Sequence, residues 1–437
     1  MEFGKHLGKG LWALADKALP VAYGIAYVVL VIRVLPEEEF GNFVLVQEIF
    51  LIISGLATAF ALQPLLKFGA EDRNDQPQVV GAALLLNAAF VIVSSLLLFV
   101  LSGPLGALFN SAGLAALILW VPAMLVASFV RNFALILLQT KFFVQRVFWT
   151  DAAHFLGAPV LIWIWSRLHM FNSALDMVII NVISLSVSSV VSLFLSSSML
   201  RISLRPGKDL LLQMWNYGKY SFGGIVSYLF YSKSDSFILS AVSGPVQVAV
   251  YNSAKIFIRI FEMVTQVIQM FIVPATSKLS SRADFDSLRT LIEKSLLFST
   301  IGMIPVFAAF LFLPSIFVHI LYGGRYMEAV PILQVFSLLS FVIALMTIGT
   351  SALLGLGEAK AGFILGMQML LISMLSYGVF IPLFGGVGAA VGCVVASFAT
   401  TWLTMVKLKR FIPFTVRSAL SRTDDIRIFI ASKWPHR

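Results

Sequence analysis

The sequence predicts an all-α integral membrane protein with about twelve transmembrane helices, and three observations support this class. Hydrophobic residues make up 59% of the 437 residues, charged residues make up only 12%, and the mean hydropathy is +0.94. Soluble proteins carry about 25% charged residues, so this composition lies well outside their range. Apolar stretches long enough to cross the hydrocarbon core, which takes about 20 residues, recur along the chain. Transmembrane β-strands are shorter and alternate in polarity, which these stretches do not.

Turn residues separate the apolar stretches. Breakers fall at Pro36, Gly103, Gly244, Gly323 and Gly385, among others. The predicted spans are residues 11–33, 43–63, 79–101, 114–138, 149–168, 176–199, 218–242, 253–275, 296–320, 329–354, 361–383 and 386–406. We do not expect the first span to be a cleaved signal peptide, because no small-residue cleavage site and polar mature start follow its apolar stretch.

Basic residues predict the orientation of these spans. Lys and Arg occupy the loops on one side of the membrane and the C-terminal tail from residue 407 onward: Lys5, Lys9, Lys67, Arg73, Lys141, Arg146, Arg201, Arg205, Lys208, Lys278, Arg282, Arg289, Lys294 and Lys360. The other side has only Arg167 and Arg325, plus Arg33 if it lies beyond its helix end. The positive-inside rule therefore predicts both termini in the cytoplasm. Membrane orientation also explains the pI near 9.7, so we expect no nucleic-acid partner.

A long link between the sixth and seventh spans predicts the domain organisation. We expect an N-terminal six-helix bundle (1–200), a cytoplasmic interfacial linker (201–217), a C-terminal six-helix bundle (218–406) and a basic cytoplasmic tail (407–437). The linker has an apolar face formed by Leu210, Leu211, Met214 and Trp215. Segment 284–294 has a similar face formed by Phe285, Leu288, Leu291 and Ile292. Both segments most simply connect spans, and a regulatory role is the alternative.

The two halves carry a weak internal repeat. The second span is entered through Phe40, Gly41, Asn42 and Phe43, and the eighth through Val248, Ala249, Val250 and Tyr251. Repeated halves are common in secondary transporters, where the substrate path lies at the repeat interface. We therefore expect a central cavity between the two bundles.

Ionisable residues inside the spans are unevenly distributed. Such groups are costly in hydrocarbon and normally face a water-filled cavity or pair with each other. The last four spans contain no Asp, Glu, Lys or Arg. Apart from Arg167 and Asp176 at span ends, the charged residues inside the spans are the basic Lys17, Arg33, Arg131, Lys219, Lys233, Lys255 and Arg259 and the acidic Asp16, Glu48, Asp151, Asp235 and Glu262. Spans 1, 2, 7 and 8 are therefore expected to form most of a net basic cavity wall, with span 4 contributing Arg131.

The eighth span carries the clearest polar pattern. Its polar residues step by three or four positions: Asn252, Lys255, Arg259, Glu262, Gln266 and Gln269. That spacing places them on one helical face, in a stripe roughly 25 Å long. A structural pair such as Arg259 with Glu262 is the alternative, but a stripe across the bilayer favours a hydrated lumen. On span 7, Tyr228, Tyr231 and Asp235 share a face, where the tyrosines either stack on sugar rings or pack between helices.

The charges also indicate a substrate class. A net basic lumen suits an anionic substrate, and Arg binds phosphate through paired hydrogen bonds. The carboxylates either neutralise neighbouring cations or bind H⁺ or Na⁺ and couple transport to an ion gradient. No catalytic residue and no metal site is predicted.

Several motifs resemble those of polysaccharide flippases of the multidrug/oligosaccharidyl-lipid/polysaccharide exporter superfamily. The turn PEEEFGNF, residues 36–43, is similar to that family's turn after helix 1, with one extra Glu. Segment 235–274 resembles its D-x-x-x-L…G-P…Y-x-x-A…P pattern, with Ala249 in place of the usual glycine. Residues 320–333, 355–360 and 381–390 resemble its later turns. Twelve spans favour this branch over the lipid II flippase branch, which has fourteen.

The resemblance implies a V-shaped pair of six-helix bundles, like that of multidrug and toxic compound extrusion (MATE) transporters, in a bacterial inner membrane. The implied substrate is an undecaprenyl-pyrophosphate-linked oligosaccharide for O-antigen, capsule or exopolysaccharide, moved by alternating access. A polysaccharide polymerase and a chain-length regulator are the implied protein partners, and membrane lipids surround the chain. No cofactor is implied beyond a coupling H⁺ or Na⁺.

Residue roles follow as expectations from the charges and the resemblance together. The expected substrate-binding residues are Arg131, Lys255, Arg259, Lys17, Lys219, Lys233, Asn252, Gln266, Gln269, Tyr228 and Tyr231. The candidate ion-coupling carboxylates are Glu48, Asp235, Glu262 and Asp16.

Two other function classes compete with this prediction. A multidrug or cation antiporter of the same superfamily is the nearer one, but its cavity should be less basic because its substrates are commonly cationic. A membrane glycosyltransferase or polymerase is the enzyme alternative, but such an enzyme would need a larger outer loop than this sequence has. We therefore expect a transporter and not an enzyme.

Overall fold

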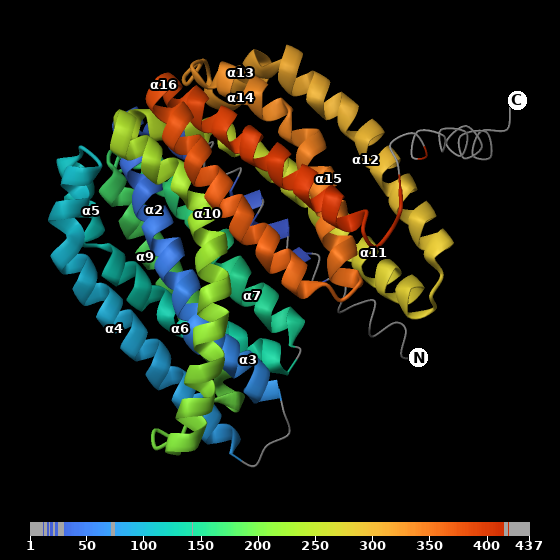
Figure 1. Cartoon of the computed structure of the whole chain (residues 1–437). Coiled ribbons are helices and arrows are strands. Elements are labelled where there is room, and N and C mark those ends of the chain that lie inside the picture. Colours follow the sequence, from blue (N-terminus) through green and yellow to red (C-terminus); the bar gives the residue numbers. More distant parts are fainter. Residues whose placement is uncertain are drawn as a thin grey trace, which may run out of the picture. The chain divides into compact units, whose positions relative to one another are not determined.

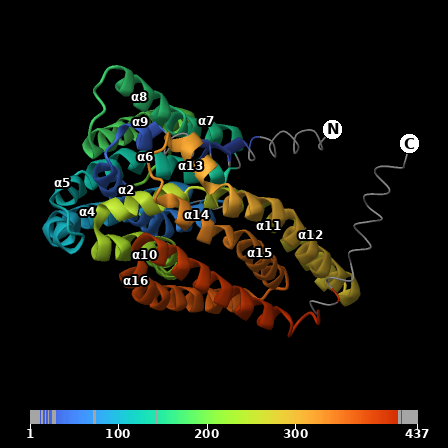
Figure 2. The ribbon, with the colours of Figure 1, turned by 90° about the horizontal axis from the view of Figure 1, so that it is seen from above.

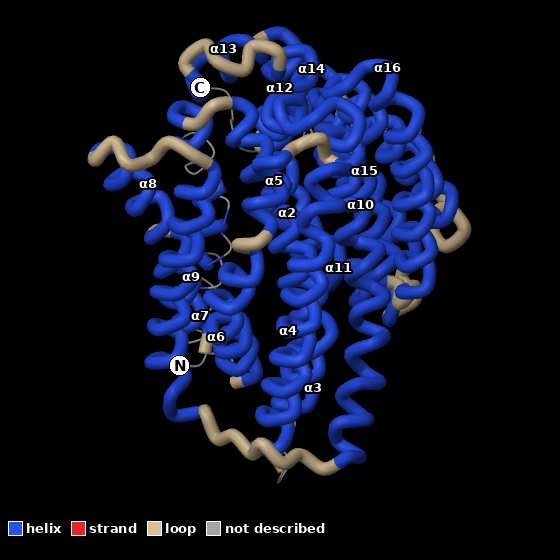
Figure 3. The backbone as a smooth tube through the Cα atoms, turned by 90° about the vertical axis from the view of Figure 1, so that its left-hand side faces the viewer, coloured by secondary structure: helices blue, strands red, loops and turns tan. Residues whose placement is uncertain are grey.

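The described part of the protein is built from helices. The computed structural model describes residues 12, 15–16, 18–20, 22–24, 30–70, 75–141, 143–414 and 418 (Figure 1). Within these residues no strand occurs (Figure 3). The predicted all-α class is confirmed. The chain divides into two compact units, Met1–Ser253 and Ala254–Arg437.

The first unit contains the helices from α2 to most of α10. They are α2 (Glu37–Ala57), the π-helical turn η1 (Thr58–Leu62), α3 (Gln63–Ala70), α4 (Gln76–Leu108), α5 (Ala112–Ile118), α6 (Val121–Thr140), α7 (Val144–Phe155), α8 (Gly157–Arg167), α9 (Ala174–Ser196), the 3₁₀ turn η2 (Ser197–Met199) and α10 (Lys208–Lys255). Helix α9 packs against both α6 and α7. Glu39 of α2 accepts a hydrogen bond from the Ala174 backbone N–H at 2.7 Å, so this acidic side chain caps the start of α9.

The second unit contains the remaining helices. They are α11 (Ile258–Ser281), α12 (Phe285–Phe312), α13 (Pro314–Tyr322), α14 (Ala329–Ser337), α15 (Leu339–Gly355) and α16 (Ala359–Leu408). Helix α15 packs against α11, α12 and α16 (Figure 2).

Among the described residues, seven helical segments are long and apolar enough to cross a membrane. They are Glu37–Gly69, Gln76–Leu108, Ala112–Thr140, Val144–Arg167, Ala174–Met199, Phe285–Phe312 and Lys360–Leu408. The bent pair Ala329–Ser337 and Leu339–Gly355 makes an eighth if it forms one span. Ten of the 23 residues of the predicted first span, 11–33, lie outside the described residues. The total of twelve stays a prediction.

Several predicted turns coincide with breaks in the helices. Pro36 is the N-cap of α2. Helix α10 is kinked at Gly244, whose backbone φ of 78° is rarely adopted by residues other than glycine. Gly323 ends α13 with a φ of 64°. Gly385, with a φ of 54°, divides α16 between the eleventh and twelfth predicted spans.

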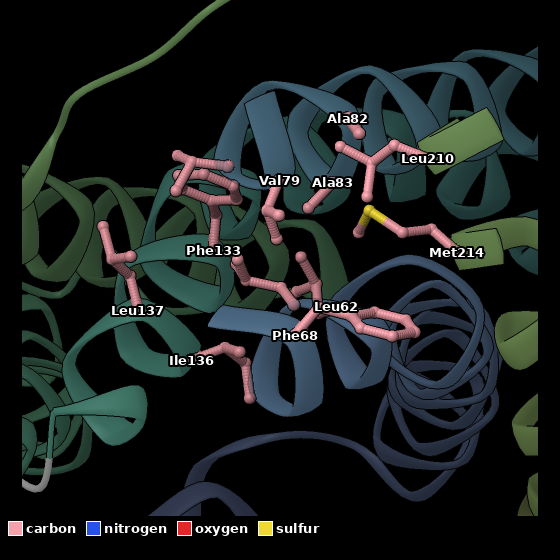
Figure 4. Close-up of a cluster of buried hydrophobic side chains, with 12 residues drawn as sticks. Leu62, Phe68, Val79, Ala82, Ala83, Phe133, Ile136, Leu137, Leu210 and Met214 are labelled. Carbon is pink, nitrogen blue, oxygen red and sulfur yellow. The ribbon is translucent and has the colours of Figure 1, made fainter. Parts of the chain in front are cut away.

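The predicted linker forms the start of α10. Helix α10 begins at Lys208, and Leu210 and Met214 are buried beside Val79 and Leu62 (Figure 4). Leu211 packs against the same cluster, whereas half of the surface of Trp215 is exposed. The apolar face predicted from these residues therefore covers helices of the first unit. Segment 284–294 likewise opens α12, where Leu288 and Ile292 are fully buried.

Helix α10 belongs by packing to the first unit. A Cβ added to Gly41 of α2 would overlap the backbone carbonyl of Pro245 in α10, so the two helices touch at a position that only glycine allows. Near the start of α10, the ring of Tyr217 also contacts the first unit: the Lys67 ammonium lies 4.7 Å from the centre of this ring. The unit boundary at Ser253 thus falls later than the predicted linker, which was drawn from the long link between the sixth and seventh predicted spans. The predicted division into two six-helix bundles stays a prediction.

Candidate functional site

Arg131 is the centre of a polar network inside the first unit. Its Nη2 forms an ion pair with Asp151 of α7, and its Nε donates to Ser188 Oγ of α9 at 3.1 Å. Its Nη1 donates to Asn132 Oδ1, and Asn132 in turn donates to Ser54 Oγ of α2 at 3.0 Å. The network therefore joins four helices, α2, α6, α7 and α9.

The geometry of this network defines what Arg131 can do. The Arg131 and Asp151 side chains are 12% and 14% exposed, so both charges are largely removed from solvent and lie against each other. Asp16, which is buried, adds a further attractive charge toward Arg131. Because buried ions are strongly destabilised without a partner, this arrangement favours a paired arginine. A phosphate would bind Arg131 only by sharing it with Asp151 or by displacing that carboxylate.

Serine side chains of α9 extend the network. Ser188 Oγ donates to the Thr150 carbonyl at 2.6 Å, and Ser184 Oγ lies 2.9 Å from His154 Nδ1. Ser184, Ser188, Ser192 and Ser196 recur every fourth residue, and all four are buried. Sequence reasoning missed this serine stripe, although its helical spacing was a readable signal.

A second ion pair links α2 to α10. Lys233 Nζ lies 3.3 Å from Glu48 Oε1. The lysine side chain is 23% exposed and the glutamate side chain 6%, so the cation is the more accessible partner. Oε1 of Gln47, the residue before Glu48, is buried and accepts no hydrogen bond from the described part of the chain. The structure therefore brings together Glu48 and Lys233, which were predicted separately as an ion-coupling and a substrate-binding residue.

Asp235 lies two residues beyond Lys233 in a different environment. Its Oδ2 accepts from the Tyr251 hydroxyl at 2.7 Å, and its Oδ1 accepts from the Ser236 backbone N–H at 2.8 Å. Both Asp235 and Tyr251 are buried. Asn252 donates to Ser236 Oγ at 3.2 Å and to the Val248 carbonyl at 3.0 Å. These contacts link the two segments of α10 on either side of Gly244.

The other candidate residues are not all placed. Two of them, Lys219 and Gln269, are exposed. Three others are half-buried: Tyr231, Lys255 and Arg259. The side chains of Tyr228, Glu262 and Gln266 lie outside the described part of the structure, as does Lys17 entirely. The polar stripe on span 8 therefore stays a prediction. No group of three or more His, Cys, Asp or Glu side chains that could hold a metal ion occurs among the described residues.

Comparison with solved structures defines the class of protein. The lipid II flippase MurJ in an inward closed conformation matches with a TM-score of 0.74 at 12% identity, over 99% of this chain and 93% of that chain. An inward-facing multidrug resistance MATE transporter matches with a TM-score of 0.71 at 15% identity, over 94% and 99%. A MOP superfamily transporter from Pyrococcus furiosus matches with a TM-score of 0.60 at 16% identity, over 92% and 93%. The chain therefore has the helical fold of these transporters, and seven of its described segments are long and apolar enough to cross a membrane.

Sequence comparison then gives the family. Residues 29–331 match the model of the polysaccharide biosynthesis protein family, and because this is most of the chain, the protein belongs to that family. The predicted family resemblance is confirmed. An uncharacterized membrane protein of Methanocaldococcus jannaschii is 26% identical over 196 residues, which are 44% of this chain and 38% of that protein. The matched region thus spans less than half of the length of this curated relative.

Proposed function

We propose that this protein is a flippase for undecaprenyl-pyrophosphate-linked oligosaccharide repeat units. It would move them from the cytoplasmic to the periplasmic leaflet of a bacterial inner membrane by alternating access, for the assembly of an O-antigen, capsule or exopolysaccharide. The observation that carries this proposal is the family match over residues 29–331 in a chain with a transporter fold. The proposed partners are the polysaccharide polymerase and the chain-length regulator that act on the same repeat units.

The basic residues inside the spans support an anionic substrate. Lys233 is the partly accessible member of its ion pair, and Lys255 and Arg259 are half-buried. A pyrophosphate offers several charged oxygens, each able to accept hydrogen bonds from such cations. Arg131 is held more tightly by Asp151, so we assign it a supporting role and give the direct phosphate contacts to Lys233, Lys255 and Arg259.

The Glu48–Lys233 pair supports coupling to an ion gradient. Protonation of Glu48, or binding of Na⁺ to it, would weaken its attraction for Lys233 and leave the lysine available to the substrate. Return of the carboxylate to its free ionised form would compete with the phosphate for the same ammonium. We therefore propose Glu48 as the first coupling carboxylate to test, ahead of Asp235, whose two oxygens both accept hydrogen bonds.

Reconstituted vesicles test the proposal directly. Lys255→Ala combined with Arg259→Ala should slow translocation of lipid-linked oligosaccharide at least ten-fold, while insertion into the vesicles is unchanged. The matched control, Lys141→Ala with Lys208→Ala, removes two exposed cations outside the predicted spans and should leave the rate unchanged. Normal translocation in the first double variant would overturn the phosphate-binding assignment.

The same vesicles test coupling and the nearest alternative. An imposed H⁺ or Na⁺ gradient should accelerate translocation by the native protein, and Glu48→Gln should remove that acceleration. The fold is also that of a multidrug resistance MATE transporter, which makes cation/drug antiport the alternative function. Gradient-driven efflux of cationic dyes, with no movement of lipid-linked oligosaccharide, would replace the flippase proposal with that alternative.

A further inference from the structure

A groove on the second unit lies between α11 and α12. It has a volume of about 540 Å³, within the range of small-molecule sites. Ile268 and Phe271 of α11 and Phe298 of α12 supply its apolar wall, and Thr290, Lys294 and Ser295 supply its polar groups. Phe271 is 66% exposed and Phe298 43% exposed, so the aromatic rings are accessible from outside the unit.

The polar residues of the groove all lie on α12. Ser287, Leu291, Lys294 and Phe298 follow at steps of three or four residues, which places them on one face of α12. Ser287 lies near the α11–α12 turn, and Lys294 lies about 14 Å along the helix from Phe285. Phe298 is one further turn away. The α12 wall of the groove therefore carries hydroxyl and ammonium groups together with apolar side chains, and its α11 wall is apolar.

The end of the unit that contains this turn is rich in positive charge. Lys278, Arg282 and Arg289 flank the turn itself. Leu408 and Ile412, at the end of α16, pack in one cluster with Leu288 and Ile292 of α12. This packing brings Lys407, Lys409 and Arg410 to the same end of the unit.

Acidic residues at this end neutralise only part of that charge. Glu293 accepts from Arg289 Nε at 2.8 Å. Asp284 caps α12, where the Ser287 hydroxyl and backbone N–H keep the pKa of this carboxyl below its usual value. Asp286 is exposed beside it, and Glu358 precedes α16. The basic residues outnumber these four acids, so an anionic head group is the ligand that matches the rim of the groove.

We propose that the α11–α12 groove binds one anionic phospholipid of the surrounding bilayer. The head-group phosphate would bind Lys294 and the hydroxyl of Thr290, and one acyl chain would lie on Phe298, Phe271 and Ile268. Lysine suits this position because its long apolar stem packs along the groove while its ammonium meets the phosphate. The site is separate from the charged residues assigned to transport, and the proposal does not depend on the transported substrate.

Native mass spectrometry of the full-length protein in detergent tests the site. Phosphatidylglycerol and phosphatidylcholine with identical acyl chains are added at equal concentration. The native protein should retain phosphatidylglycerol preferentially. Lys294→Gln should lower its retention about five-fold, the effect of one cation near an anionic lipid. Lys141→Gln, which removes an exposed cation in the first unit, should leave retention unchanged.

A second pair of variants tests the acyl-chain contact without a change of charge. Ser295→Phe should fill the groove and lower retention of phosphatidylglycerol. Gly302→Phe adds the same ring further along α12, where an added Cβ meets no atom within 4 Å, and should have no effect. An unchanged melting temperature in detergent shows that each variant is folded.

Three outcomes would overturn the proposal. Equal retention of the two phospholipids excludes head-group recognition, and equal losses in Lys294→Gln and Lys141→Gln exclude this groove. Stronger retention of undecaprenyl phosphate than of phosphatidylglycerol, lost in the same variants, would make the groove a site for the carrier lipid instead.

Discussion

The two compact units use their polar side chains differently. In the first unit, side chains bridge separate helices, as in Asn132 to Ser54 and Ser111 to Asn42 at 2.8 Å. In the second unit, buried hydroxyls such as those of Ser337, Thr400 and Thr404 donate to a carbonyl three or four residues earlier in their own helix. Thr401 is an exception, since it donates to Val342 of α15 at 3.3 Å. The first unit therefore depends on specific polar links between helices, and the second depends mainly on apolar packing.

Breaking the Arg131–Asp151 pair should have the largest effect on stability. Asp151→Ala leaves a buried guanidinium without its carboxylate, which costs about 3–5 kcal/mol in the free energy of unfolding. Denaturant unfolding in detergent, followed by tryptophan fluorescence, measures the loss.

The control for this prediction removes both charges. Arg131→Met with Asp151→Leu should recover most of the lost stability, because two apolar side chains replace the ion pair. Native stability in Asp151→Ala would show that the first unit does not depend on this link.

Removing the Tyr251 hydroxyl should have the next largest effect. Tyr251→Phe deletes a hydrogen bond to the buried Asp235 carboxylate and should cost about 1.5–3 kcal/mol, the range for bonds to charged groups. The same unfolding assay applies. In the Asp235→Asn background the tyrosine substitution should cost clearly less, and equal costs in both backgrounds would contradict a specific bond to the charge.

Disturbing the contact between α2 and α10 should have the third largest effect on stability. Gly41→Ala places a methyl group against the Pro245 backbone, which cannot yield as a side-chain end can. The expected loss is about 1–3 kcal/mol, typical of overpacking. A variant as stable as the native protein would show that α2 and α10 separate at this point without cost.

The matched substitution in the second unit should have the smallest effect and the opposite sign. Gly302 lies inside α12, and an added Cβ meets nothing within 4 Å. Gly302→Ala should therefore stabilise by about 0.4–1 kcal/mol, because alanine restricts the unfolded chain and favours the helix. A loss of stability would mean that this part of α12 is more closely packed than its neighbours indicate.

The sequence predicted the helical class, the family and many of the turns because each rests on local information. Apolar runs mark helices, and Gly244 and Gly385 interrupt α10 and α16 where their residue types suggested. The pairing of Arg131 with Asp151 was not predicted, because it depends on how α6, α7 and α9 meet. Likewise, Lys233 and Glu48 are far apart in the sequence, and only packing makes them partners. The place of α10 in the first unit rests on Gly41, whose role no single-helix pattern reveals.

The contact of Gly41 with Pro245 also has a consequence for biosynthesis. About 200 residues separate the two positions, so at about 5–20 residues per second the ribosome needs roughly 10–40 s to deliver α10 after α2. During that interval α2 is already synthesised, but the Pro245 backbone that packs against Gly41 does not yet exist. The first unit therefore stays incomplete until its last helix has been synthesised. Its closing step is the arrival of α10, after every earlier helix of the unit has been synthesised.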